Sequence, residues 1–362
     1  MEIRIDQHLF NQFSEPLEIA GPCSVESESQ LDEVVSFLKS HGIQLIRAGV
    51  WKPRTRPGSF EGIGEAALPW LKSAAEKYEI DFAIEVAKPA HVEAALKHDI
   101  SVFWIGARST ANPFTVQEIA ESLKGVDIPV MVKNPTNPDL ELWIGALERL
   151  NKYGIEKLAA IHRGFSTYRK GRYRNNPMWE IPIELKRRIP KIPLICDPSH
   201  IAGKRALIRE ISQKSIDLNY DGLMTEVHPY PEKALSDANQ QLSFKEFEEV
   251  RGSLEKRSHT IQDQSFINLL DAIRAQVDEA DHELLEVLSR RMELIQKIGE
   301  YKRDNNVAVL QMERWNHILQ TRSEWARALE LNVDFILDIY NRLHTESIQN
   351  QTEIMNQKME KL

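Results

Sequence analysis

The chain has 362 residues, 42% hydrophobic and 28% charged, which predicts a globular protein of two or three domains. A net charge of −8 argues against a general nucleic-acid binder, and no stretch reaches the roughly 20 apolar residues that a membrane span needs. The two cysteines are too few for a disulfide scaffold and the first residues do not resemble a secretory signal, so we expect reduced thiols in a cytoplasmic protein.

Turn-forming residues are concentrated in the first two thirds of the chain. All 17 prolines lie in the first 231 residues, and only two of the 16 glycines come later. Because Pro and Gly punctuate turns, the first part has many connections and the last part few. We therefore expect a first domain over residues 1–250, a linker over 251–264 and a helical domain over 265–362.

Short β-rich runs alternate with amphipathic helical patterns in the first domain. The runs are residues 16–21, 44–50, 81–86, 101–106, 129–134, 158–163, 193–197 and 222–227. Continuous apolar strands separated by helices are typical of a parallel sheet. Eight such units favour an α/β fold of the (β/α)8 barrel type, and an open doubly wound sheet is the alternative.

The rest of the chain has a helical pattern throughout. Apolar residues recur mostly every three or four positions over 265–303, and two further helices are expected at about 312–328 and 333–357. The first helix would be about 58 Å long, at about 1.5 Å per residue. Since a small domain cannot bury such a helix alone, we expect it to pack against a partner chain.

Basic side chains lie in or just after the expected strands. They are Arg47, Lys52, Arg54, Arg108, Lys133 and Arg163. In a barrel they would converge on its C-terminal face, where active sites of such barrels lie. Any one of them alone would be read as a solvated charge. Together, in an acidic protein, they indicate a polyanionic ligand or two anionic ligands, because like charges need a neutralising anion.

Four potential metal ligands lie at the same strand ends: Cys23, His200, Glu226 and Asp237. A thiolate, an imidazole and two carboxylates suit Mn, Fe, Co or Zn better than Ca or Mg. Their spacing is not a metal motif, and Cys23 alone could be a small buried hydrophobe. Cys196 precedes Asp197 within a strand and should face the packing side, while His162 is expected to make structural hydrogen bonds.

The motifs GPCSVES, RAGVWKPRT, GARS, VKNP, HRGF, DPSH and EVHPYPEKALSDANQQL occur in this order. Together they resemble the 3-deoxy-D-arabino-heptulosonate 7-phosphate (DAHP) synthases of the shorter bacterial type. The resemblance implies a metal-dependent (β/α)8 barrel that condenses phosphoenolpyruvate with erythrose 4-phosphate. The KPRT sequence favours this four-carbon sugar over the five-carbon sugar that a related family uses.

The resemblance also implies roles for the strand-end residues. Cys23, His200, Glu226 and Asp237 match the metal ligands, with Mn the first choice of ion. Arg108, Lys133 and Arg163 match contacts to the phosphate of phosphoenolpyruvate, and Arg47 and Lys52 lie near its carboxylate and reacting end. Arg54 and Thr55 match contacts to the phosphate of the sugar, and Asp197 lies near the metal and the aldehyde. Lys52 is the candidate proton donor, with a pKa that nearby cations and the metal should lower.

The last domain, with IRAQVDEADHELLEVLSRRMELIQKIGEYKRD and TESIQNQ, resembles the all-helical chorismate mutases. These are intertwined dimers that bind a dicarboxylate by electrostatics. Arg291 and Lys302, 11 residues apart, lie on one helix face, whereas Arg274 faces elsewhere, as expected if it reaches the partner's site. Arg314, Ser347 and Gln351 complete the matching set.

Two positions depart from the mutase pattern, because Gln311 replaces a common aspartate and Trp315 a glutamate. These changes put catalytic efficiency in doubt more than dicarboxylate binding. The expected function is therefore a bifunctional DAHP synthase and chorismate mutase that is a homo-oligomer and is inhibited by prephenate through its helical domain. A helical domain that only dimerises or senses is the alternative.

Overall fold

The computed structural model describes residues 3–6, 10, 13, 16–52, 58–168, 171–257 and 264–357. The chain divides into two compact units, Met1–His259 and Thr260–Leu362. None of the helices in the described ranges combines the length and apolar character needed to cross a membrane.

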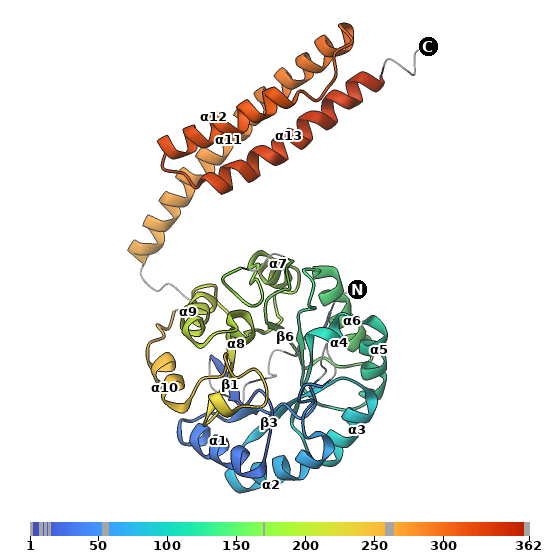
Figure 1. Ribbon diagram of the computed structural model, residues 1–362, viewed down its shortest axis with the longest axis vertical. Coiled ribbons are helices and arrows are strands. Elements are labelled where there is room, and N and C mark those ends of the chain that lie inside the picture. Colours follow the sequence, from blue (N-terminus) through green and yellow to red (C-terminus); the bar gives the residue numbers. More distant parts are fainter. Residues whose placement is uncertain are drawn as a thin grey trace. The chain divides into compact units, whose positions relative to one another are not determined.

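The first unit contains a closed barrel of parallel strands (Figure 1). The strands are β1 Leu17–Gly21, β2 Leu45–Arg47, β3 Asp81–Val86, β4 Val102–Ile105, β5 Val130–Lys133, β6 Leu158–His162, β7 Leu194–Cys196 and β8 Gly222–Glu226. Each strand pairs with the next along the chain, and β8 closes the ring against β1, from Leu17 opposite Gly222 to Gly21 opposite Glu226. The expected (β/α)8 barrel is confirmed, and the open sheet was the wrong alternative.

Helices surround the barrel on its outer side (Figure 1). They are α1 Glu28–Ser40, α2 Leu68–Tyr78, α3 Pro89–Lys97, α5 Pro113–Ser122, α6 Leu140–Lys152, α7 Glu180–Arg188, α9 Ile208–Asp217 and α10 Phe244–Gly252. Two short helices, α4 Ala107–Thr110 and α8 Pro198–Ala202, come just after the ends of β4 and β7. Short 3₁₀ turns occur at Gly64–Ala67, Arg205–Leu207 and Pro231–Lys233. Side-chain caps begin several helices, including a capping box between Ser243 and Glu246 at α10.

The strands are apolar on both faces because each face is buried in a different core. Ile19, Trp104 and Met131 belong to the cluster inside the barrel. Ile46 and Cys196 belong to the larger cluster between the strands and the surrounding helices. Each fully buried Ile or Met side chain in these clusters stabilises the fold by about 1.5–3 kcal/mol. Cys196 therefore faces the packing side, as predicted.

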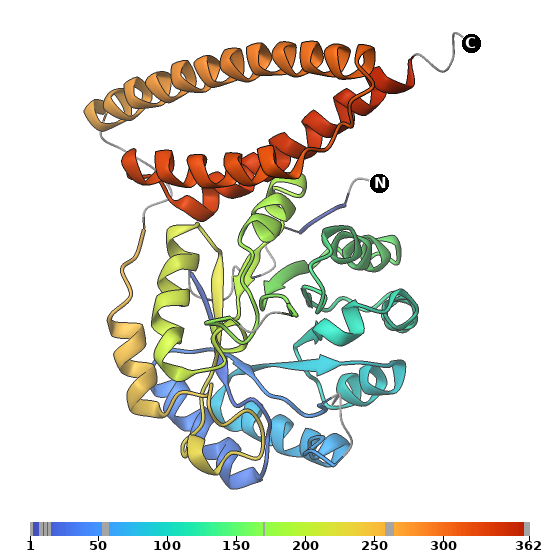
Figure 2. The ribbon, with the colours of Figure 1, turned by 45° about the horizontal axis from the view of Figure 1, so that its top comes forward.

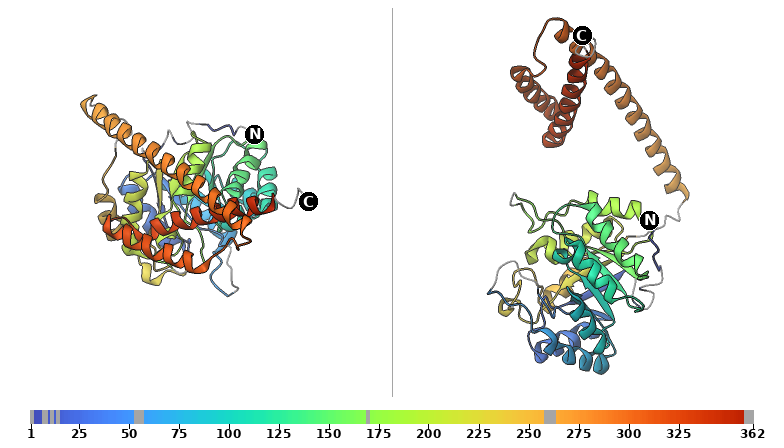
Figure 3. Two further views of the ribbon diagram at one scale, coloured as in Figure 1. Left: turned by 90° about the horizontal axis from the view of Figure 1, so that it is seen from above. Right: turned by 90° about the vertical axis from the view of Figure 1, so that its right-hand side faces the viewer.

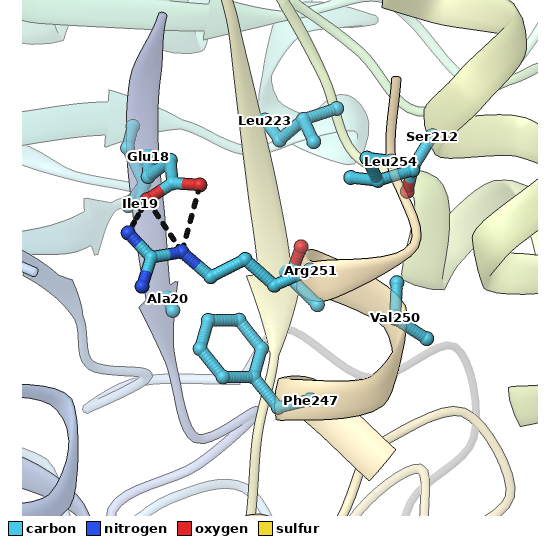
Figure 4. Close-up of a pocket in the computed structure, with 10 residues that line it drawn as sticks. Glu18, Ile19, Ala20, Ser212, Leu223, Phe247, Val250, Arg251 and Leu254 are labelled. Carbon is cyan, nitrogen blue, oxygen red and sulfur yellow. Dashed lines mark hydrogen bonds and ion pairs between the residues drawn. The ribbon is translucent and has the colours of Figure 1, made fainter. Parts of the chain in front are cut away.

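An ion pair fastens the last barrel helix to the first strand (Figure 4). The Arg251 guanidinium of α10 binds the Glu18 carboxylate of β1 through Nη2 at 2.7 Å and through Nε at 3.0 and 3.1 Å. Its Nη1 also donates to the carbonyl oxygen of His41 at 3.0 Å. Leu223 and Phe247 help to line the small pocket beside this pair (Figure 4). The contact joins the element before the linker to the strand that leads to Cys23.

The second unit consists of three helices in its described part: α11 Gln264–Asp304, α12 Met312–Ala328 and α13 Val333–Asn356. Figures 2 and 3 show α11 as one long continuous helix. Both α11 and α12 pack on α13. At Gly299 of α11, an added Cβ would lie 2.9 Å from Ile354 and 3.2 Å from Gln351 of α13, so glycine permits the close approach of these helices.

Candidate active sites at the strand ends and in the helical unit

Cys23 lies in the turn after β1, fully buried. Its thiol is 3.4 Å from Asp237 Oδ2, and the Lys52 ammonium lies 2.9 Å from its sulfur. Burial and the Glu226 carboxylate raise the pKa of the thiol to about 12, against the effect of Lys52. An added Cβ at Gly49 would lie 2.0 Å from the Cys23 carbonyl oxygen, so the turn packs directly on the chain after β2.

His200 and Glu226 form a second group of potential ligands beside the first. Nδ1 of His200 lies 2.8 Å from Asp197 Oδ2 and 3.8 Å from Glu226 Oε1. Asp197 follows β7 and caps α8 by accepting from the backbone N–H of His200. With Nδ1 held by a carboxylate, Nε2 is the nitrogen left for another partner, the arrangement usual for metal-binding histidines. The charge of Glu226 raises the pKa of Cys23, and that of His200 lowers the pKa of Asp237. The pair Cys23–Asp237 and the pair His200–Glu226 are therefore neighbours.

Arg47 and Lys133 lie among these carboxylates at the end of the barrel. The buried Arg47 donates through Nη2 to Glu226 at 2.9 Å, and its Nε and Nη1 have no hydrogen-bond partner among the described residues. Lys133 donates to Asp197 at 2.7 Å. Both cations lie over the ring of Trp104, at 5.4 and 5.5 Å from its centroid. Nη1 lies 3.8 Å from Asp197 Oδ2, an ion pair too long for a hydrogen bond, so Arg47 keeps donor capacity for an anionic ligand.

The pKa of Lys52 differs from the sequence-based expectation. Burial disfavours the ammonium, but the Cys23 thiol group and the Glu226 carboxylate outweigh burial and raise the pKa. We had expected cations to lower it. The positive charge of Arg47 does lower the pKa, but the acids that the strand ends bring to Lys52 outweigh it, and the effect of a bound metal stays a prediction.

Arg163 lies beside two further arginines. Its Nη1 donates to Asn175 Oδ1 at 2.8 Å. Burial lowers its pKa to about 10, Asp197 opposes this, and the nearby Arg174 and Arg108 lower it further. Arg108 is exposed at the start of α4, which follows β4. Because the charges of Arg174 and Arg108 act on Arg163, this region has a positive potential suited to a phosphate.

The candidate metal ligands meet in one place without forming a complete ion-binding cluster. Within the described ranges, no three His, Cys, Asp or Glu side chains are arranged to hold a metal. Cys23 pairs with Asp237, and His200 lies beside Glu226. The donor set nevertheless fits a divalent transition ion in its chemistry, and Asp197 orients the imidazole.

Two adjacent glutamines hold the site and were not singled out from the sequence. Gln240 donates through Nε2 to Glu226 Oε2 at 2.6 Å and accepts from Arg174, which itself pairs with Asp237 at 3.0 Å. Gln241 accepts from the backbone N–H of Cys23 at 2.8 Å and donates to the carbonyl of Ser236. Both amides are buried. The one sequence feature that could have indicated their role is their position three and four residues after the predicted ligand Asp237.

Three barrel residues remain from the sequence analysis: Arg54, Thr55 and His162. Arg54 and Thr55 lie outside the described residues. His162 is a structural residue, as expected, because its Nε2 bonds to the carbonyl of Pro177 at 2.7 Å and its Nδ1 to the Tyr220 hydroxyl at 2.9 Å.

In the helical unit, part of the predicted set converges. Arg291 Nη1 of α11 donates to Ser347 Oγ of α13 at 3.0 Å. Gln351 donates to the Ser347 carbonyl, and its own Oε1 is buried with no partner among the described residues. Lys302 donates to the carbonyl of Val309 at 2.5 Å. Burial lowers the pKa of Arg291 and of Lys302.

In the described part of this unit, the other predicted residues make no hydrogen bond to Arg291, Ser347 or Gln351. Arg274 is exposed and pairs with Asp271 at 3.1 Å. Arg314 is also exposed and lies 3.2 Å from His317 Nδ1. Gln311 precedes α12 and makes no side-chain cap.

Comparisons with known proteins agree with this division into two units. Residues 11–263 match the sequence model of the DAHP synthetase I family, and residues 273–352 match that of chorismate mutase type II. Phospho-2-dehydro-3-deoxyheptonate aldolase of Thermotoga maritima is 34% identical over 238 residues, 66% of this chain and 68% of that protein. The 4-amino-4-deoxychorismate mutase of Streptomyces pristinaespiralis is 31% identical over 84 residues, 23% of this chain and 65% of that protein.

A solved structure of the Thermotoga maritima enzyme, a DAHP synthase, is also similar to this chain. The TM-score is 0.59 at 31% sequence identity, and the match covers 71% of this chain and 69% of the other. A truncated form of the synthase from the same organism matches with a TM-score of 0.57 at 29% identity.

Proposed function

The chain belongs to the DAHP synthetase I family and carries a chorismate mutase type II domain, and from this premise we propose a specific pair of reactions. The barrel unit condenses phosphoenolpyruvate with erythrose 4-phosphate and water to 3-deoxy-D-arabino-heptulosonate 7-phosphate, and the phosphate of phosphoenolpyruvate leaves as inorganic phosphate. The helical unit rearranges chorismate to prephenate. The chain is thus a transferase and an isomerase of aromatic biosynthesis.

The observation that carries the barrel proposal is the set of cations at the strand ends. Lys133 and Arg163 are assigned, with the nearby Arg108, to the phosphate of phosphoenolpyruvate. Arg47, whose buried Nε and Nη1 make no hydrogen bond to any described residue, is assigned with Lys52 to its carboxylate end. Two phosphates and a carboxylate would balance a positive charge that the local acids neutralise only in part. Arg54 and Thr55 remain the proposed contacts to the sugar phosphate.

We assign Cys23, His200, Glu226 and Asp237 to a divalent metal ion, with Mn as the first choice and Fe, Co or Zn as alternatives. A bound ion of this kind supplies Lewis acidity toward the aldehyde oxygen of the sugar. Asp197 holds the His200 ring in place through Nδ1. Lys52, whose ammonium lies 2.9 Å from the Cys23 sulfur, is the proposed donor of the proton that the new alkoxide oxygen takes up when the carbon–carbon bond forms.

The helical unit binds chorismate through its two carboxylates, for which Arg291 and Lys302 are the first candidates, with Ser347 and Gln351 beside them. No covalent step is needed, because holding the reactive conformation and stabilising its charge accelerate the rearrangement. Arg314 and a partner's Arg274 are proposed to complete this site in a dimer.

We further propose that the enzyme is a cytoplasmic homodimer joined through α11. Apolar side chains on this helix are about half exposed, among them Leu269, Ile273, Val277, Leu284 and Leu285, each between 49% and 65%. A second copy of the same helix would cover them. Prephenate bound to the helical unit is proposed to inhibit the barrel reaction.

Separate assays of the full chain test the two activities. Loss of phosphoenolpyruvate should depend on erythrose 4-phosphate, cease after chelation and return on addition of Mn²⁺. Turnover that is unaffected by chelation would exclude the metal assignment, and no turnover under any metal would exclude the synthase proposal. Chorismate loss tests the second unit, and synthase turnover that saturating prephenate leaves unchanged would exclude the inhibition.

A further inference from the structure

One face of α13 carries a histidine that neither reaction has been assigned. His344, Ser347 and Gln351 are spaced three and four residues apart, so they lie on the same face of the helix. Ser347 and Gln351 are 4% and 6% exposed and belong to the contact with Arg291. His344 is half-buried one turn before Ser347. The face that gathers the polar groups of the helical unit therefore includes an imidazole.

The ring of His344 is held in a fixed plane by Trp315 of α12. The two rings are stacked, with centroids 3.7 Å apart and planes 8° from parallel. In the part of the chain that the structure describes, neither ring nitrogen of His344 has a hydrogen-bond partner. The aromatic contact thus fixes the orientation of the imidazole and leaves its nitrogens available.

The cations of the helical unit lie close enough to affect this imidazole. Burial lowers the pKa of His344, and the positive charges of Arg291 and Lys302 lower it further. The ring is therefore neutral at physiological pH, with one nitrogen that donates and one that accepts. A neutral hydrogen-bonding group beside two cations is complementary to a ligand that carries carboxylates and a neutral oxygen.

We propose that His344 contacts the ligand of the helical unit, a cyclic dicarboxylate, at its hydroxyl or ether oxygen, and that Trp315 is the positioning residue for the imidazole. Arg291 and Lys302 take the carboxylates. This inference rests on the proposed chorismate reaction. It also gives Trp315, which departs from the mutase pattern, a part in the site. The competing explanation is that the stacked pair only fastens α12 to α13.

The test compares variants of the full-length chain with chorismate as substrate and prephenate as binding probe. His344→Ala should lower kcat/KM for chorismate about tenfold or more, the effect of losing one well-placed hydrogen bond. His344→Gln, which keeps a hydrogen-bonding group, should restore part of the loss. Trp315→Phe should stay near the wild type, and Trp315→Leu should fall between Trp315→Phe and His344→Ala. His282→Ala, on an exposed part of α11, is the matched control and should leave kcat/KM within about twofold.

Thermal unfolding and helical content separate a contact with the ligand from packing. A His344→Ala protein with native helicity and unchanged kcat/KM and prephenate affinity would overturn the proposal. So would losses in every variant that only follow the folded fraction. If His344→Ala does not fold, His344→Gln and Trp315→Phe carry the test, and equal losses in both would favour packing. If the wild type binds prephenate without converting chorismate, the mutase proposal fails, and His344→Ala must still weaken binding for this inference to stand.

Discussion

Replacing the buried amide of Gln241 with an apolar side chain of similar length should destabilise the barrel unit. In the wild type, Oε1 accepts from the Cys23 backbone N–H and Nε2 donates to the Ser236 carbonyl, each at 2.8 Å. In Gln241→Met, both backbone groups would lose their partners in the interior. An unsatisfied buried group costs about 1–3 kcal/mol, so we expect the free energy of unfolding to fall by about 2–6 kcal/mol.

Urea denaturation measures this loss, provided that the transition of the barrel unit is resolved from that of the helical unit. Gln44→Met, at an exposed position before β2, is the control and should change stability by less than about 0.5 kcal/mol. Mn²⁺ binding should weaken in Gln241→Met alone, because the amide ties the Cys23 turn to the loop that carries Asp237. A Gln241→Met protein as stable as the control would refute the role assigned to these two hydrogen bonds.

Three further predictions concern the barrel. Burial lowers the pKa of His162 from 6.5 to about 3, so only the unfolded chain takes up this proton between those values. The free energy of unfolding should therefore fall by about 1.4 kcal/mol per pH unit as the pH drops below 6.5. Denaturation of His162→Gln at several pH values should show a smaller dependence of this free energy on pH. An equal dependence in the variant and the wild type would contradict the assignment. Gly49→Ala should shift the Cys23 turn and lower the unfolding midpoint in urea. Gly145→Ala is the control and should be neutral or stabilising, because the atom nearest to its added Cβ is 3.6 Å away. Equal midpoints in the two variants would argue against the close contact at Gly49. Arg251→Met should lower the free energy of unfolding by about 1 kcal/mol, because the ion pair with Glu18 is partly exposed. High salt should reduce the difference in unfolding free energy between the variant and the wild type. A difference that salt does not reduce would show that charge is not its cause.

The fold could be predicted because its signals are local. Strands buried on two faces, such as β4 and β5, read as continuous apolar runs, and their number favoured a closed barrel. Residues at or just after the ends of strands, such as Cys23, Lys133 and Asp197, were placed at one end of the barrel for the same reason. The long apolar repeat of α11 likewise predicted a single helix.

The parts that sequence reasoning missed depend on contacts between distant segments. Gln240 and Gln241 have no periodicity that marks them. Their roles appear only when the loop after β8 folds back on Glu226 and Arg174, for Gln240, and on the turn after β1, for Gln241. The pKa of Lys52 depends on which acids fold beside it, and these could not be read from the residues near it in the sequence. Likewise, stacking of Trp315 on His344 joins two helices, and neither residue alone indicates it.

Binding of Mn²⁺ to the chelator-treated full chain tests the central claim most directly, because it needs no assumption about turnover. The wild type and Cys196→Ser, which alters a buried packing cysteine, should bind one ion per barrel. Binding is measured as the loss of the free Mn²⁺ signal in electron paramagnetic resonance. Cys23→Ala should bind at least about tenfold more weakly, because it lacks one of four proposed ligands. Equal affinity in Cys23→Ala and the wild type would contradict the assignment of the strand ends to a metal site.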